Sequence, residues 1–291
     1  MLAGCDSDDT PAPSAGSPTA STAGLPEFDA QDWESVRAQF LLDPAMAQFA
    51  AFVLSPHTKV LDAAISAYRD ELGVDTEKAL LAGLDREAAV RAAAATYHGG
   101  VAEQYALTDS TTMGLGLMYG GLDVAAGDEV LTTTHDFYST EDSLRLLRRR
   151  TGASVQRVPL YDDPATATVD QMVERLAGGI TARTKVVALT WVHSSTGVRV
   201  PVAEICAALD GLSRVPRSQY VVCVDGVHGF SAVDVDLPDL GCDFLSAGTH
   251  KWLFGPRGTG ILWGRDFGPL SEVIPTFSDP SSPAGRLTPG G

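Results

Sequence analysis

The sequence has few positive charges and no long apolar run. It carries 21 Lys and Arg side chains against 37 Asp and Glu, a formal charge of −16 over 291 residues. Because such a surface repels phosphate backbones and anionic lipids, we expect no nucleic-acid partner. No stretch reaches the roughly 18 consecutive apolar residues of a membrane-spanning helix, so we expect no transmembrane segment. The hydrophobic content of 44% is nevertheless enough for a full core.

Cysteine is also scarce, and several catalytic motifs are missing. Cys206, Cys223 and Cys242 lie in apolar segments without metal-ligand spacing, which indicates small buried hydrophobes and no metal site or disulfide framework. The Gly-x-Ser-x-Gly elbow of serine hydrolases does not occur. Neither Gly-x-Gly-x-x-Gly after the first strand nor a Walker-type Gly-Lys-Ser/Thr is present, which disfavours a nucleotide-binding α/β domain.

The first 26 residues consist mostly of Ala, Ser, Thr, Pro, Gly and Asp and predict a disordered tether. Within them, residues 2–5 (LAGC) resemble a bacterial lipobox, whose cysteine is lipidated after cleavage. The charged and apolar segments that precede such a cysteine are missing, since only Met1 lies upstream. We expect an exported or lipid-anchored bacterial envelope protein with the anchor at Cys5, and keep a cytoplasmic protein as the alternative.

The remaining chain divides into a helical part and an alternating part. Residues 27–100 have a helical pattern and predict an N-terminal helical segment. Across residues 101–275, β-rich runs alternate with helices, which predicts an α/β fold with a mostly parallel sheet covered on both faces. The expected strands are residues 129–133, 154–159, 185–191, 220–224, 243–247 and 259–263. We expect helices at 139–150, 169–177 and 202–212, and another that opens within residues 107–114 and runs to about residue 121. Residues 276–291 show no closing helix or strand, and we expect them to begin a truncated C-terminal segment.

A carboxylate and a lysine follow two of the expected strands. Asp225 comes directly after the apolar run 220–224, and Lys251 follows the run 243–247, 26 positions further on. Ligands collect at the carboxyl ends of the strands in such sheets. The pair suits a pyridine-aldehyde cofactor, because the lysine forms an imine with the aldehyde and the carboxylate pairs with the protonated ring nitrogen.

Residues 221–264 resemble the class V aminotransferase superfamily of fold-type I, pyridoxal-phosphate (PLP) enzymes, and are closest to its isopenicillin-N-epimerase-like branch. The family pattern reads here as DGVH at 225–228, GTHK at 248–251 and GPRG at 255–258. The resemblance implies a PLP-binding large domain with a mostly parallel, seven-stranded type of sheet, and a C-terminal small domain that is largely missing.

The resemblance also implies roles for individual residues of these motifs. Lys251 is the imine lysine, Asp225 holds the pyridine nitrogen, and His228 lies by the phenolic oxygen of the ring. His250 approaches the phosphate or the substrate, and Thr249 lies beside it in the cofactor site. From the residues alone, a helix cap at Asp225 and a packed histidine at His228 remain as alternatives.

Three further segments are implied to reach the cofactor. Thr111 and Thr112 open a helix whose N-terminus suits a phosphate dianion, although ordinary capping uses the same residues. Ser194, in the loop after the strand 185–191, matches a small polar residue on the cofactor face. His135, after the strand 129–133, matches the ring that stacks on the pyridine, with Tyr138 as the alternative.

These observations predict a PLP-dependent enzyme that acts at the α-carbon of a small amino acid by transamination, epimerisation or elimination. The resemblance implies a homodimer. A desulfurase needs a mobile nucleophilic cysteine, and no cysteine here lies in a suitable late loop. The alternative is a catalytically inactive remnant that binds a cofactor or a partner.

Overall fold

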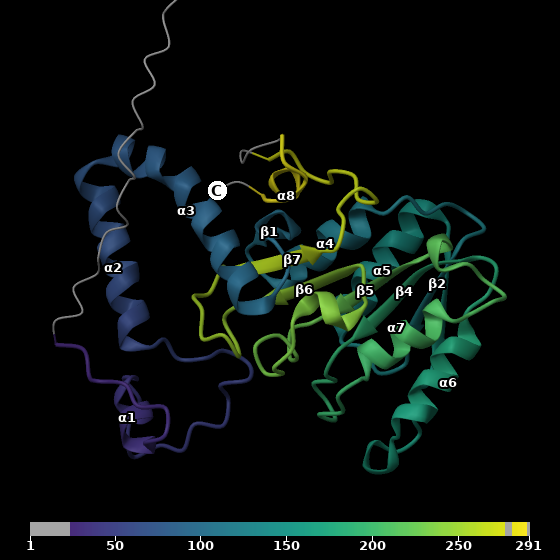
Figure 1. Ribbon diagram of the computed structural model, residues 1–291, viewed down its shortest axis with the longest axis horizontal. Helices are drawn as coiled ribbons and strands as arrows, with labels where there is room; N and C mark the ends of the chain where they lie inside the picture. The colour runs from purple at the N-terminus through teal and green to yellow at the C-terminus, as the bar shows by residue number, and fades with distance from the viewer. Residues whose placement is uncertain (1–23, 277–280, 290–291) are drawn as a thin grey trace, which may run out of the picture.

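The computed structural model describes residues 24–276 and 281–289. The lipobox-like residues 2–5 and most of the expected tether therefore lie outside the described residues. The described chain begins with a short helix and a helical pair, followed by a seven-stranded sheet flanked by helices (Figure 1).

Three helices form the N-terminal segment: α1 (Trp33–Ala38), α2 (Lys59–Val74) and α3 (Thr76–His98). Thr58 and Asp75 cap α2 and α3 by accepting hydrogen bonds from backbone N–H groups of their first turns. Between α1 and α2, residues 40–57 are not helical, and Phe40 forms an isolated β-bridge with Thr58.

The sheet has the strand order β1-β7-β6-β5-β4-β2-β3, and only β7 runs antiparallel to its neighbours. The mostly parallel sheet predicted from the sequence is thus confirmed. Its strands are β1 (Tyr105–Thr108), β2 (Glu129–Thr133), β3 (Ser154–Val158), β4 (Thr184–Thr190), β5 (Val221–Asp225), β6 (Phe244–Gly248) and β7 (Gly260–Gly264).

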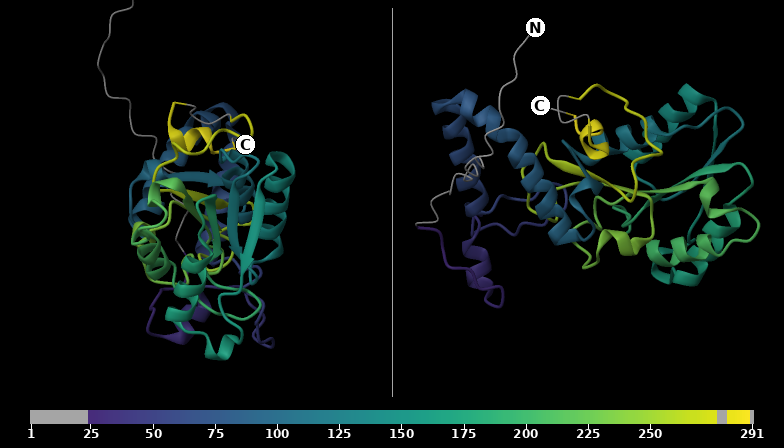
Figure 2. Two further views of the ribbon diagram at one scale, coloured as in Figure 1. Left: turned by 90° about the vertical axis from the view of Figure 1, so that its right-hand side faces the viewer. Right: turned by 45° about the horizontal axis from the view of Figure 1, so that its top comes forward.

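Helices cover both faces of the sheet (Figure 2). Alternate residues of β4 show the two layers, because side chains along a strand point to opposite faces. Val187 and Leu189 belong to the core formed with α6 and α7, and Val186 and Ala188 to the core formed with α4 and α5. The helices are α4 (Thr111–Gly121), α5 (Tyr138–Thr151), α6 (Val169–Gly179), α7 (Val202–Asp210) and α8 (Pro283–Arg286), with 3₁₀ turns η1 (Ala102–Gln104), η2 (Pro164–Thr166), η3 (Arg217–Gln219) and η4 (Leu237–Leu240).

The C-terminal residues fold back onto the sheet, which corrects the expectation that they contain no helix. Ala284 of α8 and Leu287 are buried in the same core as α4 and α5. The Thr288 hydroxyl accepts a hydrogen bond of 3.1 Å from the Leu107 N–H group of β1. This segment therefore packs against the outermost strand.

The N-terminal helices stand apart from the sheet, and only α3 runs back to it (Figure 1). No residue of α2 is buried. Apolar side chains of α2 and α3 are exposed as well, including Leu72, Val74, Leu80 and Leu81 at 51%, 87%, 63% and 71%. In the described part of the chain, none of the helices combines the length and apolarity needed to cross a membrane.

Candidate active site

Asp225 is a buried carboxylate without a cationic partner. Its side chain is 1% exposed at the carboxyl end of β5. One carboxylate oxygen accepts a 3.2 Å hydrogen bond from the Thr140 hydroxyl of α5, and the other a 3.1 Å bond from the Val227 N–H group. No arginine or lysine of the described residues forms an ion pair with it.

Burial raises the pKa of Asp225 to about 6, with the nearby Asp136 acting in the same direction and Lys251 against it. A buried carboxylate with two hydrogen bonds and no cation is costly. Such a group fits the protonated nitrogen of a pyridine ring. The Val227 bond also shows that Asp225 stabilises the turn after its strand. No helix begins at this turn, so the alternative of a helix cap at Asp225 is wrong.

Lys251 lies in the turn after β6, the strand next to β5. Burial lowers its pKa, and the negative charge of Asp225 opposes this shift. Its amine forms no hydrogen bond or ion pair with any residue that the structure describes. The turn itself is held by Thr249, whose carbonyl accepts a 2.8 Å hydrogen bond from Gly255 N–H and whose hydroxyl bonds to the Thr259 hydroxyl.

The N-terminal segment is fastened to this turn. The Ser55 N–H group and hydroxyl both donate to the His250 carbonyl, each at 3.0 Å. The Phe40 and Phe254 ring centroids lie 5.5 Å apart. The His250 Nδ1 atom is buried without a partner among the described residues. Burial lowers the His250 pKa, with Lys251 contributing, so its imidazole is available as a neutral polar group.

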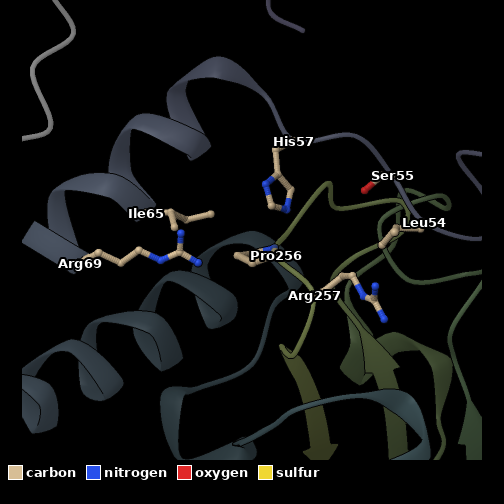
Figure 3. Close-up of a pocket in the computed structure, with 7 residues that line it drawn as sticks. All are labelled: Leu54, Ser55, His57, Ile65, Arg69, Pro256 and Arg257. Carbon is tan, nitrogen blue, oxygen red and sulfur yellow. The ribbon is translucent and has the colours of Figure 1, made fainter. Parts of the chain in front are cut away.

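An open pocket of about 460 Å³ lies between the N-terminal segment and the lysine turn (Figure 3). Arg69 of α2 and Arg257 of the GPRG turn line it, and neither forms an ion pair with another described residue. His57 lines it too and is paired with Asp62 at 2.8 Å. The remaining lining residues are Leu54, Ser55, Ile65 and Pro256. The pocket is therefore electropositive in a strongly acidic chain.

The N-terminus of α4 is joined to the end of β6. Ser110 is the cap, and its hydroxyl accepts a 3.1 Å hydrogen bond from Met113 N–H. The buried Thr111 hydroxyl accepts a 2.7 Å bond from Gly248 N–H, three residues before Lys251. The N–H groups of Thr111 and Thr112 have no partner among the described residues, as is usual in the first turn of a helix. They can bind a phosphate group, whereas the Thr111 hydroxyl holds the strand end.

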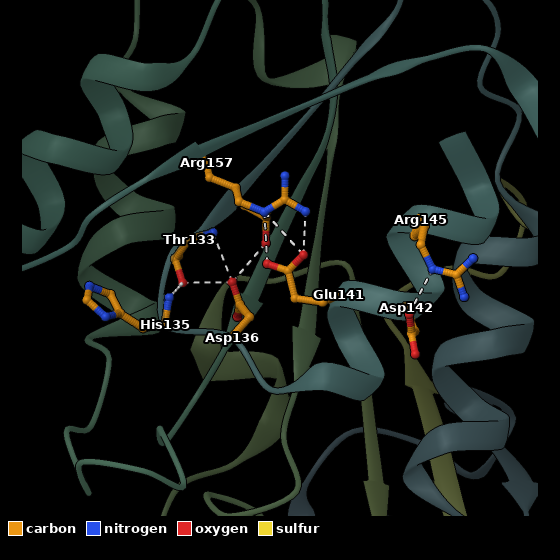
Figure 4. A network of polar contacts seen from close by, with 8 residues as sticks. Thr133, His135, Asp136, Glu141, Asp142, Arg145 and Arg157 are labelled. Carbon is orange, nitrogen blue, oxygen red and sulfur yellow. Dashed lines mark hydrogen bonds and ion pairs between the residues drawn. The ribbon is translucent and has the colours of Figure 1, made fainter. Parts of the chain in front are cut away.

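The loop after β2 is built around Asp136 (Figure 4). One carboxylate oxygen accepts hydrogen bonds from the Thr132 hydroxyl at 2.8 Å, Thr133 N–H at 2.9 Å and the Thr133 hydroxyl at 2.7 Å. The other accepts from the Thr190 hydroxyl of β4 at 2.6 Å. The Thr133 hydroxyl in turn accepts from His135 N–H at 3.1 Å, so the backbone of His135 is fixed.

The ring of His135 lies parallel to that of Tyr161, with centroids 4.0 Å apart and 9° between planes. The Tyr161 hydroxyl is hydrogen-bonded to His193 Nδ1 at 2.8 Å and to the Thr196 hydroxyl at 3.0 Å. Tyr138, the alternative stacking residue, begins α5 with 68% of its surface exposed. The half-buried His135 is therefore the better placed of the two.

His228 and Ser194 have looser environments. His228 Nδ1 accepts a 3.2 Å hydrogen bond from the Trp252 indole N–H, and burial lowers its pKa to about 4. The histidine is therefore neutral near pH 7. Ser194 is exposed, and its side chain has no hydrogen-bond partner among the described residues. Its role stays a prediction.

Sequence reasoning gave no role to Thr140, Asp136, Tyr161 or His193. Asp136, Tyr161 and His193 all follow strands at the carboxyl edge of the sheet, a position that could have marked them. Thr140 contacts Asp225 from the first turn of α5, and no signal in the sequence indicates that contact.

Taken together, the geometry fits the predicted cofactor. Adjacent segments of the sheet edge carry the buried carboxylate of Asp225, the half-buried amine of Lys251 and the Nδ1 atom of His250. Among the described residues, none of these groups has an ion-pair partner, and neither the amine nor the Nδ1 atom has a hydrogen-bond partner. The N-terminus of α4 is bonded to the same edge. PLP requires a partner for its ring nitrogen, an amine for its aldehyde and donors for its phosphate.

Comparisons with known proteins agree with this geometry. Residues 58–274 match the family model "Aminotransferase class-V". Isopenicillin N epimerase of Streptomyces clavuligerus is 29% identical over 255 residues, covering 84% of this chain and 60% of the relative. A cysteine desulfurase of Klebsiella pneumoniae subsp. pneumoniae is 32% identical over 197 residues, covering 66% of this chain and 44% of the relative.

Among solved structures, a mutant of the enzyme C-DES with glycine covalently linked to its PLP cofactor superposes with a TM-score of 0.76 at 22% identity. The match covers 88% of this chain and 69% of that one. The fold expected from the sequence is thus confirmed, and PLP is supported as the cofactor. Because the family model spans well over half of its residues, the chain belongs to the aminotransferase class-V family.

Proposed function

We propose that this chain is a PLP-dependent enzyme that acts at the α-carbon of a small amino acid, with Lys251 as the residue that binds the cofactor aldehyde covalently. The observation that carries the proposal is the buried carboxylate of Asp225, which forms no ion pair with any described residue and lies on the strand next to the one that leads to Lys251. The chain spans 60% of the length of the epimerase it matches, so the activity of the whole protein is part of this proposal.

The residues around this pair would hold the cofactor. Asp225 would pair with the ring nitrogen, and the N–H groups of Thr111 and Thr112 would bind the phosphate. His135 would stack on the ring, and the neutral His228 would lie by the phenolic oxygen. Further contacts are assigned to Ser194, Thr249 and His250.

When bound, PLP withdraws electrons from the α-carbon of the amino acid. The chain must supply an amine that is unprotonated at neutral pH, and the lowered pKa of Lys251 increases the neutral fraction. Its Nζ is then placed to take the proton from the substrate α-carbon and to return it, a step that transamination, epimerisation and elimination share.

Asp225 has the opposite requirement, because it must be ionised to pair with a protonated ring nitrogen. With a pKa of about 6 it is already mostly ionised at pH 7. A cation placed beside it favours the ionised form further. The Thr140 and Val227 hydrogen bonds orient the carboxylate.

The three described cysteines disfavour desulfuration as the reaction of this part of the chain, because that reaction needs an accessible thiolate. Burial raises the pKa of Cys206 to about 12, and burial raises the pKa values of Cys223 and Cys242 still further. None of the three is accessible as a thiolate nucleophile.

The test uses the small number of lysines, which are Lys59, Lys78, Lys185 and Lys251. Cofactor-free protein is titrated with PLP, its visible absorbance is recorded, and the adduct is reduced with borohydride and mapped by mass spectrometry. We expect a visible band and a single modified peptide containing Lys251. Lys251→Ala should abolish both, whereas Lys78→Ala, at an exposed position on α3, should leave both unchanged.

An absorbance spectrum that does not differ from that of free PLP, or modification spread evenly over the lysines, would sink the proposal. Amino acids added to the loaded protein should change the band. If the band forms and no amino acid changes it, the chain binds the cofactor without acting, as the remnant hypothesis states.

The proposal extends to partner and location. The exposed apolar side chains of α2 and α3 support a homodimer in which these helices are covered. Export with a lipid anchor at Cys5 stays a prediction, because this residue lies outside the described part of the chain.

A further inference from the structure

Tyr161 is a buried aromatic residue next to the proposed stacking ring. Its side chain is 2% exposed and follows β3, and its ring covers one face of the His135 imidazole. A 9° angle between planes and a 4.0 Å centroid distance mean that the two rings overlap closely. Because an imidazole has two faces, only the opposite one remains for another ring.

The Tyr161 hydroxyl is anchored on a different loop. His193 and Thr196, both in the loop after β4, lie within hydrogen-bond distance at 2.8 and 3.0 Å. The loops after β2, β3 and β4 are thereby joined through one phenol. Both bonds fix the plane of the Tyr161 ring, and with it the plane in which His135 can lie.

Burial favours the neutral form of both histidines in this assembly. His193 is completely buried, and burial lowers its pKa to about 4 in spite of the opposing charge of Asp136. Burial also lowers the pKa of His135; Asp136 opposes this and Arg175 adds to it. A neutral imidazole stacks on a protonated pyridine ring without charge repulsion.

We propose that Tyr161, held by His193, is a positioning residue that fixes the His135 ring so that its free face receives the cofactor ring. The inference rests on the proposed function, since it takes His135 as the stacking residue. It adds two residues that act through His135 and do not themselves touch the cofactor.

The test compares Tyr161→Leu, which removes the ring, with Tyr161→Phe, which removes only the two hydrogen bonds. The matched control is Tyr220→Phe, because Tyr220 is also buried and its hydroxyl donates to the Leu209 carbonyl at 3.1 Å, at the other end of β5. Any general effect of losing a buried tyrosine hydroxyl will be visible in this control.

Two measurements are made on each protein. In the cofactor-free chain, the ring-proton NMR signals of His135, assigned with His135→Gln, report stacking through the ring current of Tyr161. In the loaded chain, titration gives the dissociation constant for PLP, and visible circular dichroism reports the orientation of the bound ring.

We expect Tyr161→Leu to move the His135 signals towards those of an unstacked histidine, to raise the PLP dissociation constant by about two- to tenfold, and to reduce the dichroism. Tyr161→Phe should change all three in the same direction by less, and Tyr220→Phe should change none. If Tyr161→Leu does not fold, the comparison of Tyr161→Phe with Tyr220→Phe decides.

Two results would overturn the inference: His135 signals that do not depend on Tyr161, or an affinity and dichroism that both Tyr161 variants leave at wild-type values. A wild-type chain that forms no visible band refutes the proposed function instead. The NMR comparison still tests the stack in that case.

Discussion

Replacing Asp225 by asparagine should stabilise the cofactor-free protein while removing the partner of the pyridine nitrogen. The carboxyl has a pKa of 3.8 in an ordinary environment and about 6 in the fold. As pH rises, the unfolded chain releases this proton near pH 4, and the folded chain keeps it until about pH 6. Between these values the folded state binds more protons, so the free energy of unfolding falls as pH rises and then levels off.

The magnitude follows from the difference between the two pKa values. Each unit is worth 1.36 kcal/mol, so at pH 8, where the folded carboxyl is ionised, its burial lowers the free energy of unfolding by roughly 3 kcal/mol. At pH 5 the folded carboxyl must bind a proton that the unfolded chain has released, and the cost is about 1.5 kcal/mol. Asparagine has nearly the same shape and does not ionise. Its carbonyl can accept the Val227 N–H bond, and its amide can donate to the Thr140 hydroxyl.

Urea unfolding of the cofactor-free proteins at pH 5 and pH 8 measures this cost. The asparagine variant should be more stable than wild type at both pH values, with the larger gain at pH 8. Asp123→Asn, at an exposed position, is the control and should show no gain at either pH. Saturating PLP should reverse the order, because wild type binds the cofactor more tightly and gains stability by mass action.

The reasoning would be refuted by a variant that is no more stable than wild type at pH 8. A gain independent of pH would also contradict it, since the cost of the carboxyl should rise between pH 5 and pH 8. If PLP stabilised the asparagine variant as much as wild type, Asp225 would not be a partner of the cofactor.

Two further predictions concern the sheet edge and the N-terminal helices. Thr111→Val removes the acceptor of the Gly248 N–H group, so it should lower the free energy of unfolding in urea by about 1–3 kcal/mol and weaken PLP binding. Thr112→Val, at an exposed side chain, should leave stability unchanged. Equal effects of the two substitutions would contradict the role of the bond. Leu81→Lys places a charge on the exposed apolar surface of α3 and should shift the protein from dimer towards monomer, as measured by the mass from sedimentation equilibrium. An unchanged mass would mean that this surface is not the dimer interface.

Strands were predictable where a local pattern decides the structure. The strand 129–133 was predicted to the residue, because an apolar and β-branched run lies between polar turns. β1 was missed, because it has only four residues and is defined by pairing with β7, more than 150 positions away. Local sequence carries no signal for that pairing.

The same distinction holds for the candidate site. Asp225 and Lys251 were predicted because each follows a strand and matches a family motif. The contacts of Thr140 with Asp225 and of Tyr161 with His193 arise when loops and helices pack together, so no spacing in the sequence indicates them. The phosphate-binding role of Thr111 stays a prediction, and its hydroxyl accepts a hydrogen bond from Gly248 N–H that the sequence did not indicate.

The bonds between Ser55 and the His250 carbonyl have a consequence for the order of folding. They join residues 195 positions apart, so the turn that carries the lysine is completed only after nearly the whole described chain has been synthesised and brought together. A nascent chain that ends before residue 250 therefore contains the whole N-terminal segment but not the turn to which this segment is fastened. The N-terminal segment can therefore dock on the lysine turn only late in synthesis, when two distant parts of the described chain come together.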